Sequence, residues 1–398
     1  MNNLSLENKD SRWIVLVGGG TGGHVVPLKN IAEQIFKQKP GSKILVITDR
    51  GYKKRSEQIF KELVSEYKNN LLLKHVSGGR FRRYSRSRFR ELIDIRTQAL
   101  NLRDLFKSII GIIQSKLISI KYPPEVVFCK GGTGSLEYCF ANRKKASILV
   151  HDSDSRPGLT NKIVGRWAVK TLTGMPQSVD EVDRLSKNFV GVPVNSDFKK
   201  FSNKITQEIK SELLIDQKVK TVLITGGSLG ARKINELVFC TISYLNKLNI
   251  LVIHQTGSSD DSKKAKEIKK SLNNPKLYRP FDFTTEVAKL YAVSDLVVSR
   301  AGASAIQELA NSAKPAILIP AGLTDQKKNG QILDELGAAL VADQDKLLNK
   351  PEEFIREIQF LLDDQRRRAE LSERISLLAK PDTVTKIVEE LLALKENK

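Results

Sequence analysis

The residues best suited to chemistry lie in a glycine-rich stretch near the start of the chain, residues 18–24, which reads Gly-Gly-Gly-Thr-Gly-Gly-His. Glycine is unfavourable inside a helix or strand, where each one costs roughly 0.5–1 kcal/mol relative to alanine. Here the glycines suit a tight loop between an apolar strand over 13–17 and a helix over 25–37. Bare N–H groups and the positive end of a helix dipole make such a loop an anion site. His24, at its end, is the one side chain there that can move a proton near neutral pH.

Two further glycine clusters follow apolar runs. Residues 131–135 read Gly-Gly-Thr-Gly-Ser, and residues 226–231 read Gly-Gly-Ser-Leu-Gly-Ala. Loops at the carboxyl ends of parallel strands open onto one edge of the sheet, where open α/β folds bind their ligands. A ligand that carries phosphate is therefore the leading hypothesis.

The elements that must position these loops alternate between strand-like and helix-like runs. The apolar runs of the N-terminal half are 14–17, 44–48, 126–129 and 148–151, and the pattern restarts after Pro193 with 221–225, 250–254, 296–299 and 316–320. The alternation predicts an α/β protein with two Rossmann-like domains and parallel sheets. We expect domains over 1–193 and 194–350. Residues 351–398 form a helical segment whose last helix is a candidate to pack back on the first domain.

Composition and charge limit the classes of protein to which this chain can belong. Among 398 residues there are three cysteines, without a C-x-x-C pair, and four histidines, so neither a disulfide framework nor a zinc site is indicated. No run of ~18 apolar residues predicts a membrane-spanning helix, and the first apolar run is too short for a signal peptide. The formal net charge of +21 calls for an acidic partner such as nucleic acid, anionic lipid or a phosphorylated substrate.

A basic segment begins at Arg80 and ends at Arg90, with six arginines and three aromatic residues. Arginine favours bidentate contacts with phosphate, and aromatics between cations suit a bilayer surface or a nucleic acid; a solvated basic loop is the alternative. The run that follows, 100–120, has a wide apolar face. We interpret it as a helix that packs on the core rather than one that inserts into a membrane.

Taken alone, the first loop also satisfies the dinucleotide fingerprint G-x-G-x-x-G at Gly18, Gly20 and Gly23. Asp49 ends the second strand, where an acid that binds ribose would lie. On this hypothesis the protein is an NAD-dependent oxidoreductase. The hypothesis gives no role to the loop at 226–231 or to His24.

Considered together, the motifs resemble those of the MurG family of glycosyltransferases. The most specific is residues 19–24 with Val25 and Pro27, and the others are His151-Asp152 with 158–162, residues 226–232, residues 300–303 with Glu308, and Asp325-Gln326 with Asn329. The resemblance covers residues 15–341. It implies the GT-B fold, in which two parallel sheets face each other across a cleft. It also implies an inverting transfer of N-acetylglucosamine from UDP-N-acetylglucosamine to a lipid-linked muramoyl peptide of peptidoglycan synthesis.

The resemblance implies that the second domain binds the UDP-sugar. Glu308 would accept the ribose hydroxyls, and Asp325 and Gln326 would bind the sugar. Phe283 and Thr284 would line the uracil pocket. The diphosphate would meet the glycine loop and a helix start: Gly227, Ser228, Gly230, Gly302, Ala303 and Ser304.

The first domain would hold the undecaprenyl-diphosphate acceptor, with His24 as the general base that deprotonates the attacking hydroxyl. A helix N-terminus should lower the pKa of His24 and keep the imidazole neutral. The acceptor residues that the resemblance implies are Gly20, Thr21, Gly22, Gly23, Gly131, Gly132, Thr133, Gly134, Asp152, Asp154 and Asn161.

Three positions depart from the family pattern. Asp152 stands where the family has glutamate, Val192 where it commonly has asparagine, and Asn195 where it commonly has arginine. Asparagine cannot clamp a phosphate bidentately. Diphosphate binding must therefore rely on the loops, on Arg232 or Arg300, or on another group.

Asp152-Ser153-Asp154 also fits the D-x-D motif of metal-dependent sugar transferases, but those lack the duplicated glycine-rich architecture. We expect no metal and no cofactor, since the UDP-sugar is a substrate. The expected partners are UDP-N-acetylglucosamine, the undecaprenyl-diphosphate acceptor and an anionic membrane surface at residues 80–90, without nucleic acid, at the cytoplasmic face of the membrane. A glycolipid synthase of the same fold and a basic nucleotide-binding module remain alternatives.

Overall fold

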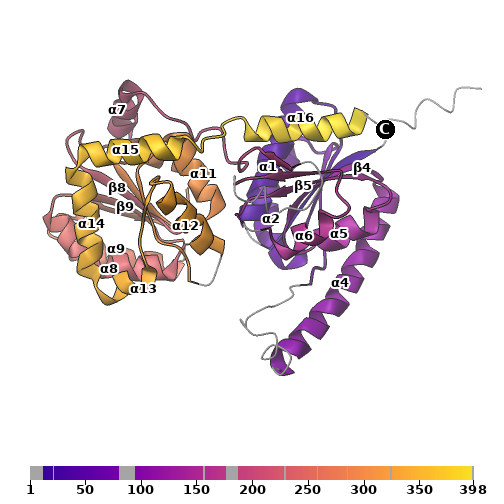
Figure 1. Cartoon of the computed structure of the whole chain (residues 1–398), viewed down its shortest axis with the longest axis horizontal. Helices are drawn as coiled ribbons and strands as arrows, with labels where there is room; N and C mark the ends of the chain where they lie inside the picture. The colour runs from indigo at the N-terminus through magenta and orange to yellow at the C-terminus, as the bar shows by residue number, and fades with distance from the viewer. Residues whose placement is uncertain are drawn as a thin grey trace, which may run out of the picture. The chain divides into compact units, whose positions relative to one another are not determined.

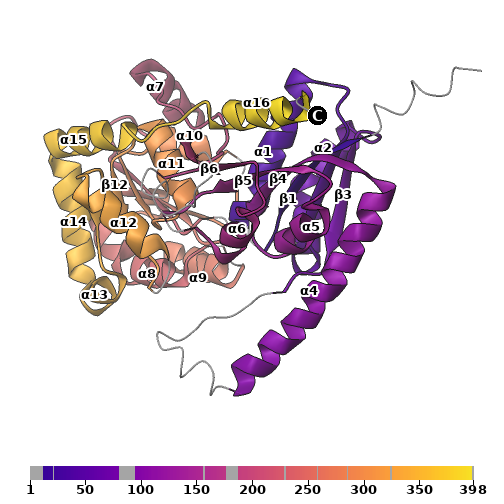
Figure 2. The same cartoon turned by 45° about the vertical axis from the view of Figure 1, so that its right-hand side comes forward.

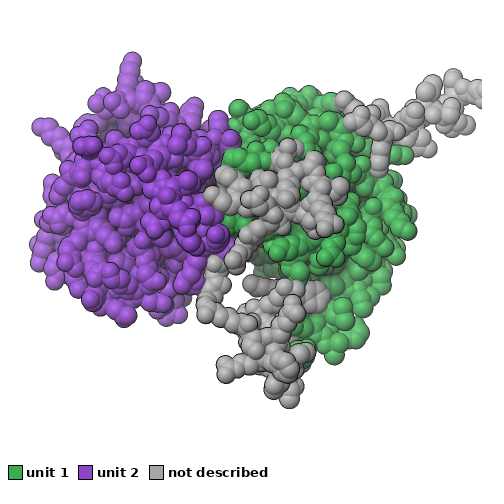
Figure 3. Space-filling model, viewed as in Figure 1, with its two compact units in different colours: residues 1–193, 382–398 green, residues 194–381 purple. Residues whose placement is uncertain are grey.

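The computed structural model describes residues 12–396, apart from Thr21, 80–94, 156, 176–186, 228–229, 258, 285 and 323–324. The chain divides into two compact units (Figure 3). Unit 1 comprises residues 1–193 with 382–398, and unit 2 comprises residues 194–381. Each unit is built around one parallel sheet.

Unit 1 contains a seven-stranded sheet in the order β3-β2-β1-β4-β5-β6-β7, in which every pair is parallel. The strands are β1 Trp13–Gly18, β2 Ile44–Asp49, β3 Leu71–Val76, β4 Pro124–Gly131, β5 Ser147–Asp152, β6 Lys170–Thr173 and β7 Lys187–Phe189. The helices are α1 Gly22–Gln38, α2 Lys53–Glu66 after the short helix η1 Arg50–Tyr52, α4 Ile95–Lys121, α5 Ser135–Asn142, α6 Leu159–Val164 and α16 Thr383–Glu396. Strand order reverses between β1 and β4, so ligands are expected at the carboxyl ends of these two strands.

Alternate residues of the central strands fill two separate cores in unit 1. Ile14 and Leu16 pack with α1 on one face of the sheet, while Val15 and Val17 pack with α5 on the other. Helix α16, although last in the chain, completes the first of these cores with Ile387, Val388, Leu391 and Leu392. The hydroxyl of Thr383 at its start donates to the carbonyl of Val190 over 2.7 Å. The end of the chain is therefore an integral part of unit 1 (Figure 1).

Unit 2 contains a six-stranded parallel sheet in the order β10-β9-β8-β11-β12-β13. The strands are β8 Thr221–Thr225, β9 Leu251–Gln255, β10 Tyr278–Phe281, β11 Leu296–Ser299, β12 Ala316–Leu318 and β13 Leu340–Val341. The helices are α7 Asn203–Glu212, α8 Arg232–Lys247, α9 Ser259–Lys270, α10 Val287–Val293, α11 Ala303–Ser312, α12 Asp325–Glu335, α13 Gln344–Asn349, α14 Pro351–Asp363 and α15 Gln365–Ser376, with the short helix η3 Pro275–Leu277 before β10. Order reverses between β8 and β11, the second place where a ligand is expected.

Helix α4 differs from its sequence-based interpretation. Only Ile118 of its apolar side chains packs against a core cluster of the described residues. Eight others are between 47% and 71% exposed, namely Leu102, Leu105, Phe106, Ile109, Ile110, Ile113, Leu117 and Ile120. The face that packs against α5 (Figure 2) is instead small and polar, with Ser108, Gly111, Ser115 and Ser119 buried. Ser108 donates to Glu137 of α5 over 2.7 Å, and Gly111 lies so close to the carbonyl oxygen of Ser77 that a Cβ would come within 1.9 Å of it. Amphipathic periodicity shows that a helix has two faces, but it does not say which face meets the protein.

Two parallel α/β domains were predicted, and the two sheets confirm this. No helix among the described residues is both long and apolar enough to cross a bilayer.

Candidate active site

The first two glycine loops of unit 1 pack directly on each other at the carboxyl ends of β1 and β4. The amide of Gly19 donates to the carbonyl of Gly131 over 3.2 Å. A Cβ on Gly132 would lie 2.0 Å from the carbonyl oxygen of Gly19, and one on Gly19 would lie 2.1 Å from that of Thr133. Gly132 and Gly134 also have φ near +85°. Part of the glycine requirement therefore comes from contact between the two loops and not from a ligand.

His24 is the third residue of α1 and is half-buried beside these loops. Burial, and then the positive charge of Lys130, lowers the pKa of His24 to about 4. The N-terminal end of a helix dipole acts in the same direction. The imidazole is therefore neutral at pH 7 and can accept a proton, as a general base must.

Asp152, at the end of β5, is buried and organises the loop that follows it. Its carboxylate accepts hydrogen bonds from the amides of Asp154 (3.3 Å) and Gly158 (3.1 Å) and from the Nδ2 of Asn161 (2.9 Å). Burial raises the pKa of Asp152 to about 6, although the hydrogen bonds from Asn161 and Gly158 oppose the shift. Asn161 in turn lies over the second loop, since a Cβ on Gly131 would come within 2.6 Å of its Oδ1. The predicted acceptor residues Gly131, Asp152 and Asn161 are thus brought together.

In unit 2, the glycine loop after β8 leaves open space at one position. Gly227 has φ of +82°, and a Cβ there would meet nothing within 4 Å. Its amide donates to the hydroxyl of Thr225 over 3.0 Å. Gly230 is different, because a Cβ there would lie 2.2 Å from the carbonyl oxygen of Thr256. There is therefore room for a ligand next to Gly227, whereas position 230 must be glycine because it packs against the carbonyl of Thr256.

Helix α11 follows β11, the strand next to β8 in the sheet. Its N-cap residue, Gly302, supplies no side-chain hydrogen bond to the first amides of the helix, which include those of Ala303 and Ser304. A Cβ on Gly302 would have a single neighbour within 4 Å, the Nε2 of Gln326 at 3.9 Å. Uncapped amides at a helix start with open space around the cap residue form an anion site.

Glu308 lies on α11, one turn beyond Ser304. Its Oε2 accepts a hydrogen bond from the hydroxyl of Tyr291 on α10 over 3.2 Å, and Tyr291 packs edge-on against Phe198. Burial raises the pKa of Glu308 to about 7, and the hydrogen bond from Tyr291 acts against this shift. The sequence identified Glu308 but not Tyr291, whose contact links residues 17 positions apart.

The start of α12 is tied to the loops that follow β11 and β12. The Oε1 of Gln326 accepts from the amide of Ala321 over 3.0 Å, and the Nδ2 of Asn329 donates to the carbonyl of Ala301 over 3.1 Å. Gln326, one of the two predicted sugar-binding residues, therefore lies next to Gly302, and Asp325 is the first residue of the same helix. Phe283 is 58% exposed, and the hydroxyl of Thr284 accepts from the amide of Glu286.

Asn195, which stands in place of the hinge arginine, and the two proposed substitutes, Arg232 and Arg300, each have a partner within unit 2. Asn195 caps a local turn with Asp197. Arg300 donates to the carbonyl of Ile319, and the exposed Arg232 pairs with a glutamate of its own helix. Thr21, Ser228 and the segment from 80 to 90 lie outside the described residues.

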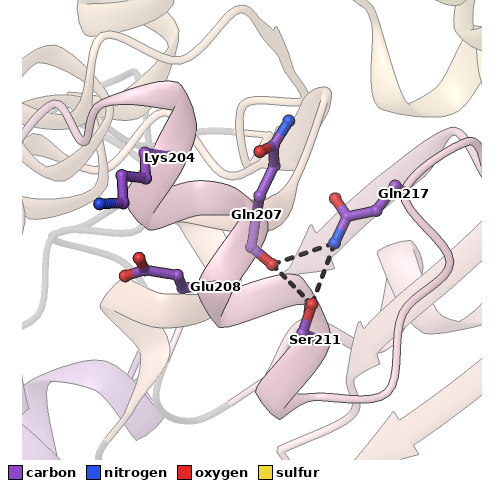
Figure 4. Close-up of a pocket in the computed structure, with 5 residues that line it drawn as sticks. All are labelled: Lys204, Gln207, Glu208, Ser211 and Gln217. Atoms are coloured by element: carbon purple, nitrogen blue, oxygen red, sulfur yellow. Dashed lines mark hydrogen bonds between the residues drawn. The ribbon is translucent and has the colours of Figure 1, made fainter.

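Within the described part of the chain, no group of three or more His, Cys, Asp or Glu side chains could hold a metal ion. A shallow hollow on unit 2 involves none of the predicted site residues. It lies on α7 and the turn after it, lined by Lys204, Gln207, Glu208, Ser211 and Gln217 (Figure 4).

Both units match known protein families. Residues 14–173 match the glycosyltransferase family 28 N-terminal domain, and residues 221–387 match the C-terminal domain of the same family. A UDP-N-acetylglucosamine–N-acetylmuramyl-(pentapeptide) pyrophosphoryl-undecaprenol N-acetylglucosamine transferase of Treponema denticola is 30% identical over 87% of both chains. A transferase of the same name from Flavobacterium psychrophilum is 30% identical over 96% of this chain and 98% of its own.

Solved structures share the fold. MurG of Acinetobacter baumannii superposes with a TM-score of 0.69 and 20% identity, over 96% of this chain and 99% of its own. A UDP-GlcNAc 2-epimerase of Neisseria meningitidis, bound to UDP-GlcNAc, gives a TM-score of 0.64 with 12% identity, over 96% of this chain and 100% of its own. Transferases and epimerases share this architecture, so the fold alone does not select the reaction.

Proposed function

Because the chain belongs to the MurG family of glycosyltransferases, we propose that it transfers N-acetylglucosamine from UDP-N-acetylglucosamine to an undecaprenyl-diphosphate-linked N-acetylmuramyl-pentapeptide. The observation that carries the proposal is the similarity to transferases of this name over nearly the whole chain, at 30% identity. The sites of both units fit such a reaction.

Unit 2 has the features that a UDP-sugar needs. The uncapped start of α11 and the open space at Gly227 suit a diphosphate. Glu308, on the same helix and bonded to Tyr291, would accept hydrogen bonds from the two ribose hydroxyls once its carboxylate is ionised. Gln326, fixed beside Gly302 by its bond to Ala321, suits a sugar hydroxyl.

Unit 1 suits the acceptor and the base. In this proposal the two packed loops bind the acceptor's diphosphate through backbone amides, and His24 lies beside them. The acceptor hydroxyl attacks the anomeric carbon, its proton passes to the neutral imidazole, and the bond to UDP breaks with the electron pair leaving on the diphosphate oxygen. A single displacement of this kind inverts the anomeric configuration.

The exposed face of α4 supports a peripheral position on an anionic membrane. Contiguous apolar surface of this extent is uncommon on soluble proteins and marks an interaction site. The helix carries five basic residues and a single acidic one, Asp104, which is buried and paired with Arg103 and Lys107. An apolar helix face flanked by cations binds at the boundary between headgroups and acyl chains, where a lipid-linked acceptor would be presented.

An acceptor panel tests the proposed reaction. UDP release from UDP-N-acetylglucosamine is measured with the undecaprenyl-diphosphate acceptor, with diacylglycerol and with neither. We expect release only with the first. Release with diacylglycerol alone would identify a glycolipid synthase, and thermal stabilisation by NAD but not by UDP would refute both assignments.

A further inference from the structure

The three residues that follow β3, residues 77–79, lie between the second glycine loop and α4. On one side, a Cβ on Gly78 would come within 2.4 Å of the amide nitrogen of Gly134. On the other side, a Cβ on Gly79 would come within 2.3 Å of the hydroxyl oxygen of Ser108 and 2.4 Å of the carbonyl oxygen of Asp104, both on α4. Two consecutive glycines therefore allow the backbone of the 77–79 segment to contact the loop and the helix at once.

Glu137 joins this segment to both helices beside it. It lies in the first turn of α5, and its side chain is only 2% exposed. Its Oε1 accepts hydrogen bonds from the amide of Gly79 over 3.0 Å and from the hydroxyl of Ser108 over 2.7 Å. Burying a carboxyl group is costly unless it is hydrogen-bonded. Here one oxygen atom of α5 binds a donor of the segment and a donor of α4.

Helix α4 also holds the beginning of the segment. The Oε1 of Gln114 accepts a hydrogen bond from the amide of Ser77 over 2.8 Å. A Cβ on Gly111 would lie 1.9 Å from the carbonyl oxygen of Ser77 and 3.0 Å from the Cγ of Glu137. The segment, α4 and α5 are therefore in contact around Gly111, on the face of α4 that packs against α5 (Figure 2).

The position of Glu137 connects these contacts to the second glycine loop. Gly134, the last glycine of that loop, is the N-cap residue of α5, and Glu137 follows it by one turn. The loop therefore packs against the first loop through Gly132 and against the 77–79 segment through Gly134. Backbone amides bind a diphosphate well only if they are held to within about 0.5 Å of the required geometry.

We propose that Glu137 is a positioning residue for the lipid-linked acceptor. By joining the 77–79 segment and α4 to α5, it keeps the second loop where that loop binds the acceptor's diphosphate. The inference rests on the proposed function for the identity of the acceptor. Because both hydrogen bonds end on Oε1, the side-chain oxygen is the required group, and glutamine can supply the same oxygen.

Steady-state kinetics with each substrate varied in turn test this role. Glu137→Ala should raise the KM for the undecaprenyl-diphosphate-linked acceptor about tenfold and leave kcat and the KM for UDP-N-acetylglucosamine unchanged. Glu137→Gln, which retains the oxygen, should restore the acceptor KM. A purely structural role would lower the fraction of active protein and change neither KM. An unchanged acceptor KM in a folded Glu137→Ala protein, or equal increases in both KM values, would overturn the proposal.

Glu125→Ala is a matched control for lost stability. Glu125 lies at the other end of β4 and pairs with Lys395 over 3.4 Å, so its loss should leave the acceptor KM unchanged. Glu137→Asp covers the case in which Glu137→Ala does not fold. The shorter side chain moves the oxygen away from its two donors, so the acceptor KM should again rise. An unchanged acceptor KM in Glu137→Asp would also overturn the proposal.

Binding of undecaprenyl diphosphate in detergent micelles, without donor, separates this inference from the proposed function. If no transfer is detected but the affinity falls in Glu137→Ala and not in Glu137→Gln, the positioning role holds and the assigned reaction is wrong. If transfer occurs and neither this affinity nor the acceptor KM changes in Glu137→Ala, the inference is wrong and the reaction stands. No binding to the unmodified protein would refute the diphosphate site and the inference with it.

Discussion

Glu308 gives the donor site a pH dependence that can be measured. Burial raises the pKa of its carboxyl to about 7. The ionised form accepts stronger, charge-assisted hydrogen bonds from the ribose hydroxyls, so affinity for UDP-N-acetylglucosamine should increase as pH rises through 7. The diphosphate of this donor is esterified at both ends and does not titrate in this range. The change in affinity therefore reports on the protein.

The magnitude follows from the ionised fraction. With a pKa of about 7, about one tenth of Glu308 is ionised at pH 6 and about nine tenths at pH 8. If only the ionised form binds, the Kd should be about tenfold higher at pH 6 than at pH 8, equivalent to about 1.4 kcal/mol. Glu308→Gln removes a charged acceptor, at a cost of about 1.5–3 kcal/mol, and should abolish the pH dependence.

Isothermal titration calorimetry at several pH values between 6 and 8.5 checks both expectations. Tyr291→Phe removes the hydrogen bond that lowers the Glu308 pKa, so it should move the midpoint to higher pH. Glu373→Gln, an exposed glutamate of the same unit, is the control. A Kd that stays constant from pH 6 to 8, or unchanged affinity in Glu308→Gln, would refute the assignment of this carboxylate to the ribose.

Three further predictions concern unit 1. Gly132→Ala should lower the free energy of unfolding of this unit by about 3 kcal/mol in calorimetry, because the new Cβ meets a carbonyl oxygen at 2.0 Å and φ is +84°. Gly158→Ala, whose Cβ would meet nothing within 4 Å, should change it by no more than about 0.5 kcal/mol. Equal losses in the two variants would contradict the explanation by loop contact. His24→Ala should lower kcat by about 10²–10⁴ and leave donor affinity unchanged, and normal turnover would remove it as the base. Leu117→Glu on α4 should weaken sedimentation with anionic vesicles, while Leu214→Glu, an exposed leucine of unit 2, should not; equal binding of both variants would count against α4.

The central strands of both sheets were predictable from the sequence because they are continuous apolar runs. β1 and β8 carry such runs, which a strand buried on both faces requires. The outer strands were not identified. β3 contains Lys74 and His75, and β13 has only two residues, so neither produces an apolar run that stands out from its surroundings.

The orientation of α4 could not be obtained from periodicity, but a signal was present. Ser108, Gly111, Ser115 and Ser119 recur at helical spacing, and small residues allow close approach to a neighbouring helix. The helix therefore has two candidate packing faces in its sequence, one apolar and one of small residues.

The sequence motifs identified the site residues in the loops after each strand. They did not identify the residues that contact those loops from within the fold. Lys130 lies at the end of an apolar run, where a charged residue is costly unless it has partners, and that was the available signal. The sequence around Tyr291 contains no comparable signal, since the hydrogen bond from Tyr291 to Glu308 depends on how α10 and α11 pack. The packing of Gly19 against Gly132 was equally inaccessible, because it joins loops more than 100 residues apart.

The proposed reaction joins N-acetylglucosamine to a lipid-linked muramyl peptide. Mass spectrometry of the lipid after incubation with UDP-N-acetylglucosamine and the undecaprenyl-diphosphate acceptor tests it most directly. We predict a product heavier by one N-acetylhexosamine, formed in equal amount to the UDP released and absent without either substrate. An acceptor of unchanged mass, in the presence of a protein that binds both substrates, would refute the proposed transfer.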